Sequence, residues 1–208
     1  ENALSLHVHK VTLNPKRDLD VFFFTGPART GKSHFATWLA KQTNPEQPPG
    51  WSASNNDPWE GYHGEQVMVL DDFRDSGRVG FDDFLKMSDK NYRSPITSRN
   101  KNRIFLGDTL IITSVINFTS WYASNTTEQR LQLYSRLQTV AKFTEDVVYF
   151  YEWNPDLENH VPAGSIYNQW SEKNQKIQKV TPLKERFGKL GITLEETFNP
   201  NVMNLKED

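Results

Sequence analysis

The chain contains no cysteine and only three methionines among its 208 residues. The absence of cysteine excludes disulfide bonds and thiolate metal sites, and it is consistent with an intracellular protein. No apolar run approaches the roughly 18 residues that a membrane-spanning helix requires, so we predict no membrane association. The formal net charge of −2 gives no overall attraction for nucleic acid. Any such binding must therefore come from a local cluster of basic residues.

One strong motif stands out, G-x-x-x-x-G-K-S at residues 26–33. It follows an apolar run at residues 21–24 and precedes a helical pattern over residues 34–42, which is the strand–loop–helix context of a phosphate-binding loop. Backbone N–H groups and the helix N-terminus would face the anion, Lys32 would reach the β- and γ-phosphates, and Ser33 would hold Mg²⁺. An unoccupied glycine turn is the alternative. The predicted nucleotide-binding residues are Gly26, Pro27, Ala28, Arg29, Thr30, Gly31, Lys32 and Ser33.

Two acids, Asp71 and Asp72, follow a second predicted buried strand at residues 67–70. Ligands of open α/β sheets bind outside the carboxyl ends of the strands, so both acids should lie beside the phosphate loop. Asp71 would coordinate Mg²⁺ through water or Ser33, and Asp72 would orient or deprotonate the attacking water. A simple cap for the following turn is the alternative.

These motifs, together with G-Y-H-G-E at residues 61–65 and L-D-D-F at residues 70–73, resemble the helicase domain of replication-initiator (Rep) proteins. Such proteins occur in circoviruses and related single-stranded DNA viruses and plasmids, and the domain belongs to helicase superfamily 3. The resemblance covers roughly residues 21–153. It implies an α/β, three-layer P-loop NTPase of the AAA+ type with a mostly parallel central sheet.

The resemblance also implies cofactors and partners. They are ATP and Mg²⁺, single-stranded DNA, and further copies of the chain in a ring that we expect to be hexameric. An origin-nicking endonuclease domain usually precedes the motor, so we expect one in a longer, full-length chain. The location would be the host nucleus for a eukaryotic virus, or the cytoplasm for a bacterial plasmid or phage.

Six basic residues lie between positions 86 and 103, and turn signals at 94–95 and 99–102 predict a hairpin there. In the family, a hairpin at this place lines the central channel and carries a basic residue that grips the DNA backbone. By position, Arg99 or Lys101 corresponds to it. Arg103 would extend this electrostatic track, and Tyr92 would stack on a base. A solvated charged loop is the alternative.

The residue that senses the γ-phosphate departs from the family's pattern in this sequence. The family often has an asparagine directly after the strand that we predict at residues 109–114, but this chain has Val115 there. We assign the role to Asn117, the nearest asparagine. Thr113 or Ser114 could replace it, or hydrolysis could be slow.

Arg136 lies where the family has an arginine that reaches the nucleotide of the neighbouring subunit. It falls on a helix predicted over residues 127–137, with Thr127 as the N-cap. Such an arginine supplies charge at the transition state and couples hydrolysis to ring assembly. An ordinary surface arginine is the alternative.

Around the core at residues 21–153, residues 1–20 are predicted to be a linker or subunit-contact arm. His7 and His9 in it are interpreted as alternation on a short strand, although His-hydrophobe-His binds metal in rolling-circle nicking endonucleases. A helix is expected over residues 81–89 and a strand over 147–151. Residues 154–208 are predicted to be a C-terminal extension with short helices at 165–176 and from 181 onward.

The sequence thus predicts ATP-driven DNA unwinding during replication. Two other functions stay open. One is an RNA-directed ATPase of similar fold, because nothing in the predicted hairpin distinguishes RNA from DNA. The other is a nucleotide-gated scaffold that binds DNA and oligomerises, for which Val115 is the best argument.

Overall fold

A computed structural model describes residues 16–74, 79–98 and 103–175. Seven strands form the main sheet, in the order β2-β3-β6-β1-β7-β8-β9. Their bounds are β1 Asp20–Thr25, β2 Gly50–Trp51, β3 Val67–Leu70, β6 Thr109–Ser114, β7 Thr139–Phe143, β8 Val147–Asn154 and β9 Asn159–Tyr167. The helices are α2 Lys32–Thr43, α3 Phe81–Met87 and α4 Thr127–Arg136, with a 3₁₀ turn η1 at Phe118–Ser120.

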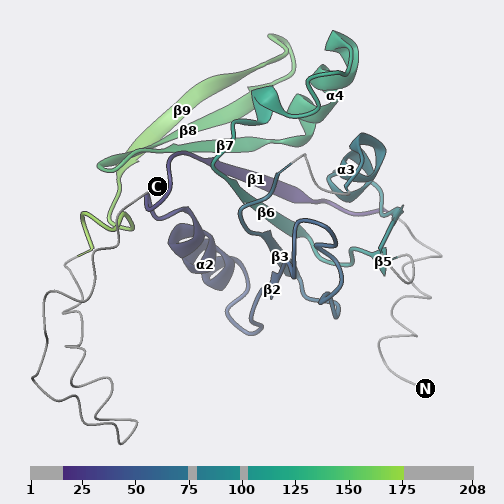
Figure 1. Cartoon of the computed structure of the whole chain (residues 1–208), viewed down its shortest axis with the longest axis horizontal. Helices are drawn as coiled ribbons and strands as arrows, with labels where there is room; N and C mark the ends of the chain where they lie inside the picture. Colours follow the sequence, from purple (N-terminus) through teal and green to yellow (C-terminus); the bar gives the residue numbers. More distant parts are fainter. Residues whose placement is uncertain (1–15, 75–78, 99–102, 176–208) are drawn as a thin grey trace, which may run out of the picture.

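The sheet is mostly parallel and is covered on both faces (Figure 1). Strand β1 pairs in parallel with β6 and β7, and the parallel arrangement continues through β3 to β2. Strands β8 and β9 are antiparallel additions at one edge. Helix α2 lies on one face, and α3 and α4 lie on the other. The predicted three-layer α/β fold is therefore confirmed.

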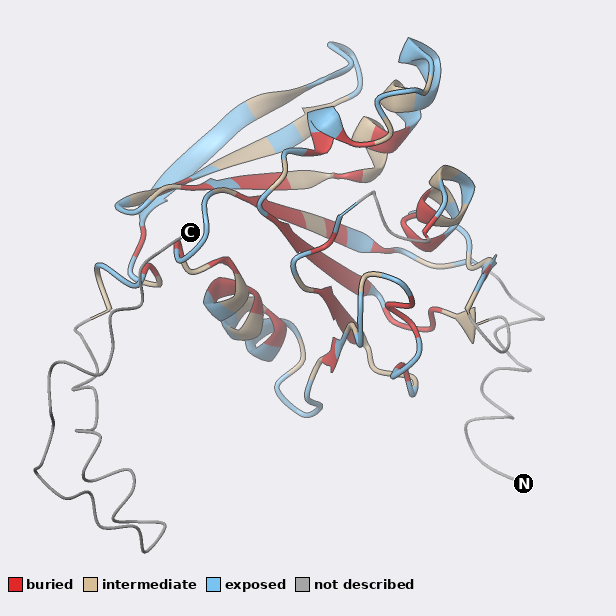
Figure 2. Ribbon diagram, in the orientation of Figure 1, coloured by how far each residue is buried: buried red, intermediate tan, exposed pale blue. Residues whose placement is uncertain are grey.

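Alternation along β1 divides the core between the two faces. Phe24 points to the α2 side, where its ring packs against Phe35 at a centroid distance of 5.1 Å. Phe23 points to the opposite side and meets Trp121 at 5.0 Å. Side chains of a strand alternate between faces, so one aromatic run anchors both layers. Figure 2 shows that burial decreases across the sheet, from the buried central strands to the exposed β9.

Two local predictions were wrong. A helix was expected over residues 165–176, but residues 165–175 do not form one, because β9 continues to Tyr167 in register with β8 and is followed by turns. Pairing across the β8–β9 hairpin overrides the local helical pattern. The N-cap of α4 is Thr126 rather than Thr127, since the Thr126 hydroxyl accepts a hydrogen bond from the Gln129 backbone in a capping box.

The sheet also extends beyond residue 153, the end of the predicted core, because β8 ends at Asn154 and β9 lies wholly within the predicted C-terminal extension. The predictions for His7, His9 and the helix from residue 181 lie outside the described residues. Within residues 16–74, 79–98 and 103–175, we find no helix with the length and apolar character needed to cross a bilayer.

We expect Phe23→Ala to lower the free energy of unfolding by about 3–5 kcal/mol, because the buried ring leaves a cavity between Trp121 and Phe118. Urea unfolding measures the change. Tyr167→Ala is the control, since that side chain is 64% exposed, and its effect should stay within about 0.5 kcal/mol. A loss below about 1 kcal/mol for Phe23→Ala would contradict the packing described here.

Candidate nucleotide-binding site

The phosphate loop connects β1 to α2 in a conformation that requires glycine at two points. Gly26 and Gly31 have φ angles of 144° and 85°, in the range that favours glycine. A Cβ atom on Gly26 would lie 2.3 Å from the Phe143 carbonyl oxygen, and one on Gly31 would lie 2.2 Å from the Trp170 carbonyl oxygen. The predicted strand–loop–helix context is confirmed.

The first turn of α2 is open to an anion. Gly31, the N-cap, provides no side chain to cap the helix, and the first turn contains no acidic residue. The first N–H groups of a helix have no intrahelical partner, and the helix dipole adds partial positive charge there. This terminus has the chemistry of a phosphate site.

Lys32 folds back over the loop. Its Nζ donates to the carbonyl oxygens of Gly26 at 2.8 Å and Pro27 at 2.7 Å. Burial lowers the pKa of Lys32, and the nearby charges of Asp72 and Asp71 oppose that shift. The ammonium group and both acids therefore share one electrostatic environment, as the sequence predicted.

The acid pair is held by hydroxyl groups from two neighbouring elements. Ser33 Oγ on α2 donates to Asp71 Oδ1 at 2.7 Å. Thr113 Oγ1 on β6 donates to the same oxygen at 2.7 Å and accepts from the Asp72 backbone N–H at 2.9 Å. From sequence we considered Thr113 only as a replacement for the sensor asparagine. Its position beside β3 fixes both acids.

Asp72 occupies a left-handed backbone conformation, with φ 47°. Aspartate tolerates this region better than most residues, and strained backbone is common at functional sites. Its carboxylate is about half exposed and forms an ion pair with Arg74 at 3.0 Å. Such an exposed pair adds little stability and can be exchanged for other partners.

The donor set at Ser33 and Asp71 suits Mg²⁺. This ion prefers oxygen ligands, keeps several waters and usually takes one or two carboxylates together with substrate phosphates. A hydroxyl and a carboxylate oxygen 2.7 Å apart, beside the N-terminus of α2, provide these groups. Ser33 and Asp71 are thus the residues that could hold the metal.

Arg136 is not brought to the phosphate loop within one chain. It closes α4 and forms an ion pair with Asp89 at 3.0 Å. Two residues on, the Gln138 side chain accepts from the Val21 N–H at 2.8 Å and donates to the Leu19 carbonyl at 3.1 Å. These are residues at the start of β1, whereas the phosphate loop follows the end of that strand.

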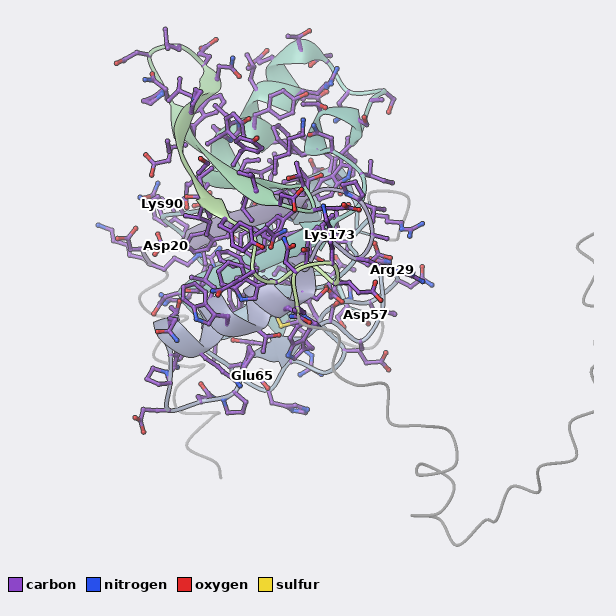
Figure 3. The ribbon with its side chains drawn as sticks, turned by 90° about the vertical axis from the view of Figure 1, so that its left-hand side faces the viewer. Asp20, Arg29, Asp57, Glu65, Lys90 and Lys173 are labelled. Carbon is purple, nitrogen blue, oxygen red and sulfur yellow. The ribbon has the colours of Figure 1, made fainter. Side chains whose placement is uncertain are left out.

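In Figure 3, Asp20, at the start of β1, and Arg29, in the phosphate loop, lie on opposite sides of the view, with Lys90 on the side of Asp20. Asn117 accepts a hydrogen bond from the Thr119 N–H and so caps η1. The catalytic roles of Asn117 and Arg136 stay predictions.

The predicted hairpin is present, with β4 (Pro95–Ile96) antiparallel to β5 (Arg103–Ile104). Arg103 donates to the backbone carbonyls of Tyr62 at 3.3 Å and Glu60 at 3.2 Å, and Tyr92 is 51% exposed. Arg99 and Lys101 lie outside the described residues. DNA binding by these four residues stays a prediction.

A further group of contacts with the loop could not be predicted from the sequence. The side-chain amide of Asn168 donates to the Thr30 carbonyl at 2.9 Å, and the Glu172 N–H donates to the Arg29 carbonyl at 3.0 Å. No local motif marks these residues. They reach the loop because β9 runs antiparallel to β8 and ends where β8 begins.

The fold and these contacts define a P-loop domain with the geometry of a nucleotide site. A family model described as RNA helicase matches residues 22–116. Over 141 residues the chain is 33% identical to the replication protein of Onion yellows phytoplasma (strain OY-M), covering 67% of this chain and 37% of that protein.

Two replication-associated proteins are similar as well. The chain is 36% identical to that of Porcine circovirus 1 over 122 residues, covering 58% of this chain and 36% of the relative. It is 36% identical to that of Porcine circovirus 2 over 129 residues, covering 60% and 38%. The matched regions span less than two fifths of each relative. The chain contains a Rep-like superfamily 3 helicase domain.

We expect Thr113→Val to weaken Mg²⁺-dependent nucleotide binding by about 10- to 100-fold, because a residue that orients a metal-binding carboxylate is lost. Titration of a fluorescent ATP analogue with and without Mg²⁺ measures the change. Thr113→Ser keeps the hydroxyl and should bind like the wild type. If Thr113→Val also binds like the wild type, the hydroxyl does not position Asp71.

Proposed function

We propose that this chain is the ATP-dependent DNA helicase motor of a rolling-circle replication initiator. The observation that carries the proposal is the convergence of Lys32, Ser33 and Asp71 at the open N-terminus of α2, within a Rep-like domain. The printed names of the relatives, replication protein and replication-associated protein, support a role in replication.

In the proposed mechanism, the loop N–H groups and Lys32 bind the phosphates and hold the nucleotide in line for attack. Ser33 and Asp71 would hold Mg²⁺, which neutralises charge on the phosphate oxygens. Asp72 orients a water molecule and accepts its proton as attack proceeds. The exposed carboxylate and its exchangeable pair with Arg74 support this role.

Arg136 acts on the nucleotide of the neighbouring subunit. Arg136 lies near the start of β1, whereas its own phosphate loop follows the end of that strand. This position supports a role between subunits rather than within one. A ring, which we propose to be hexameric, would bring this face of one subunit against the loop of the next. Hydrolysis would then require assembly.

The β4–β5 hairpin holds the single-stranded DNA in the channel of the ring. In the sequence, β4 precedes and β5 follows Arg99 and Lys101, and Tyr92, which is exposed, comes shortly before β4. Basic groups bind phosphates of any sequence, and an aromatic ring stacks on any base, which suits a motor that moves along DNA.

RNA is the second candidate substrate. The description of the matching family model as RNA helicase favours it, and phosphate contacts alone do not distinguish the two nucleic acids. Stimulation of ATP hydrolysis by single-stranded RNA but not by single-stranded DNA would replace the DNA proposal with this one.

We expect Asp72→Asn to bind ATP within a few-fold of the wild type but to hydrolyse it about 10²- to 10⁴-fold more slowly, because a general base is lost. Lys32→Ala should lose nucleotide binding itself. Steady-state hydrolysis with and without single-stranded DNA, combined with equilibrium binding, separates the two effects. Normal hydrolysis by Asp72→Asn would remove that residue from the mechanism. Binding without hydrolysis in the wild type would indicate a nucleotide-gated scaffold.

We expect Arg136→Ala to slow hydrolysis by about 10³-fold or more, and to reduce the activity of wild-type subunits when the two are mixed. Hydrolysis is measured across a series of mixing ratios. Asp89→Asn is the matched control, because it removes the charge that pairs with Arg136 and keeps the arginine. Equal losses in both variants, with no effect on mixed wild-type subunits, would indicate a role only within the subunit.

A further inference from the structure

A cavity of about 360 Å³ opens beside the first turn of α2. The phosphate loop and the start of α2 line one side of it. Trp170, Glu172 and Gln175, which follow β9, line the other side. The volume is within the range of about 300–1,000 Å³ that is common for small-molecule sites.

The second wall is firmly attached to the loop. The Asn168 amide bridges the carbonyl oxygens of Thr30 at 2.9 Å and Thr144 at 2.6 Å. Further along, the Gln175 side chain lies within hydrogen-bond distance of His34 Nδ1, at 2.7 Å. Contacts at both ends of the segment fix its distance from the loop, so the cavity is a built feature of the fold.

The orientation of a bound nucleotide follows from the positions of the acids. Ser33 and Asp71, which could hold the metal, fix the end of the triphosphate that reacts. Lys32 and Ser33 line the cavity together with His34, the next residue of the helix, whereas neither Asp71 nor Asp72 does. The reacting phosphate therefore belongs at the side of the cavity formed by Lys32 and Ser33, and the remote part of the nucleotide is directed toward the wall formed by Trp170 and Gln175.

The chemistry of the second wall suits a base and a sugar better than more phosphate. Trp170 is half-buried, with its ring packed against Phe35 at 4.7 Å and Trp38 at 5.4 Å. Gln175 adds an amide with both donor and acceptor groups. Glu172 is paired with Arg29 at 3.5 Å, so the two charges offset each other and the wall after β9 adds no net positive charge for a phosphate.

We propose that Trp170, Gln175 and His34 form the nucleoside subsite of the nucleotide-binding site. Trp170 stacks on the base, and Gln175 and His34 hydrogen-bond to polar groups of the base or ribose. The proposal rests on nucleotide binding as proposed above. It adds residues after β9 to a site that the sequence motif confines to the loop and α2.

The test compares two competitors, ATP and inorganic tripolyphosphate, for displacement of a fluorescent ATP analogue from the full chain in the presence of Mg²⁺. Trp170→Ala should weaken ATP binding by about 5- to 150-fold, the range expected for one lost base–aromatic stack. Tripolyphosphate lacks a nucleoside, so its affinity should not change. Trp170→Phe should retain most of the affinity for ATP.

Trp38→Ala is the matched control, because Trp38 packs against Phe35 and Trp170 but does not line the cavity. This variant should bind both competitors like the wild type. Gln175→Ala should weaken the binding of ATP several-fold and leave the binding of tripolyphosphate unchanged. This variant keeps the aromatic packing. Equal weakening of both competitors, or of neither, by Trp170→Ala would overturn the subsite. Wild-type protein that binds neither competitor would overturn nucleotide binding, and the subsite with it.

Discussion

One carboxylate oxygen, Asp71 Oδ1, is the point on which the site depends. It accepts hydrogen bonds from Ser33 on α2 and from Thr113 on β6, both at 2.7 Å. Hydrogen bonds to a charged acceptor contribute about 1.5–3 kcal/mol each. They fix the end of β3 relative to the helix that presents the phosphate loop. Without them the acids and the loop would be neighbours with no defined geometry.

The aromatic core supports this arrangement from both sides of the sheet. Phe24 and Phe35 pack β1 against α2, directly behind the loop. Phe23 and Trp121 pack the opposite face, where α3 and α4 lie. A densely packed interior has two effects here: it holds the strand ends at a constant spacing, and it leaves the polar groups at their carboxyl edge.

Much of the site could be predicted because its parts are local in sequence. Lys32 and Ser33 follow from one octapeptide, and Asp71 and Asp72 follow from a buried strand that ends in two acids. Other features could not be predicted. The helix expected over residues 165–176 is wrong because β9 pairs with β8, and Trp170 reaches Gly31 only through that hairpin. Arg136 lies far from its own loop, which no spacing in the sequence indicates.

The sequence alone therefore determined the phosphate loop, its flanking strand and helix, and the alternation that gives β1 two buried faces. Each of these depends on backbone conformation and side-chain direction over a few residues. The residue types and the spacing of the apolar residues indicate both directly. Tertiary structure decided which distant groups meet the loop. Asn168 bonds to Thr30 across 138 positions of the chain, and such a contact depends on strand order and register, which are set by the packing of the whole sheet.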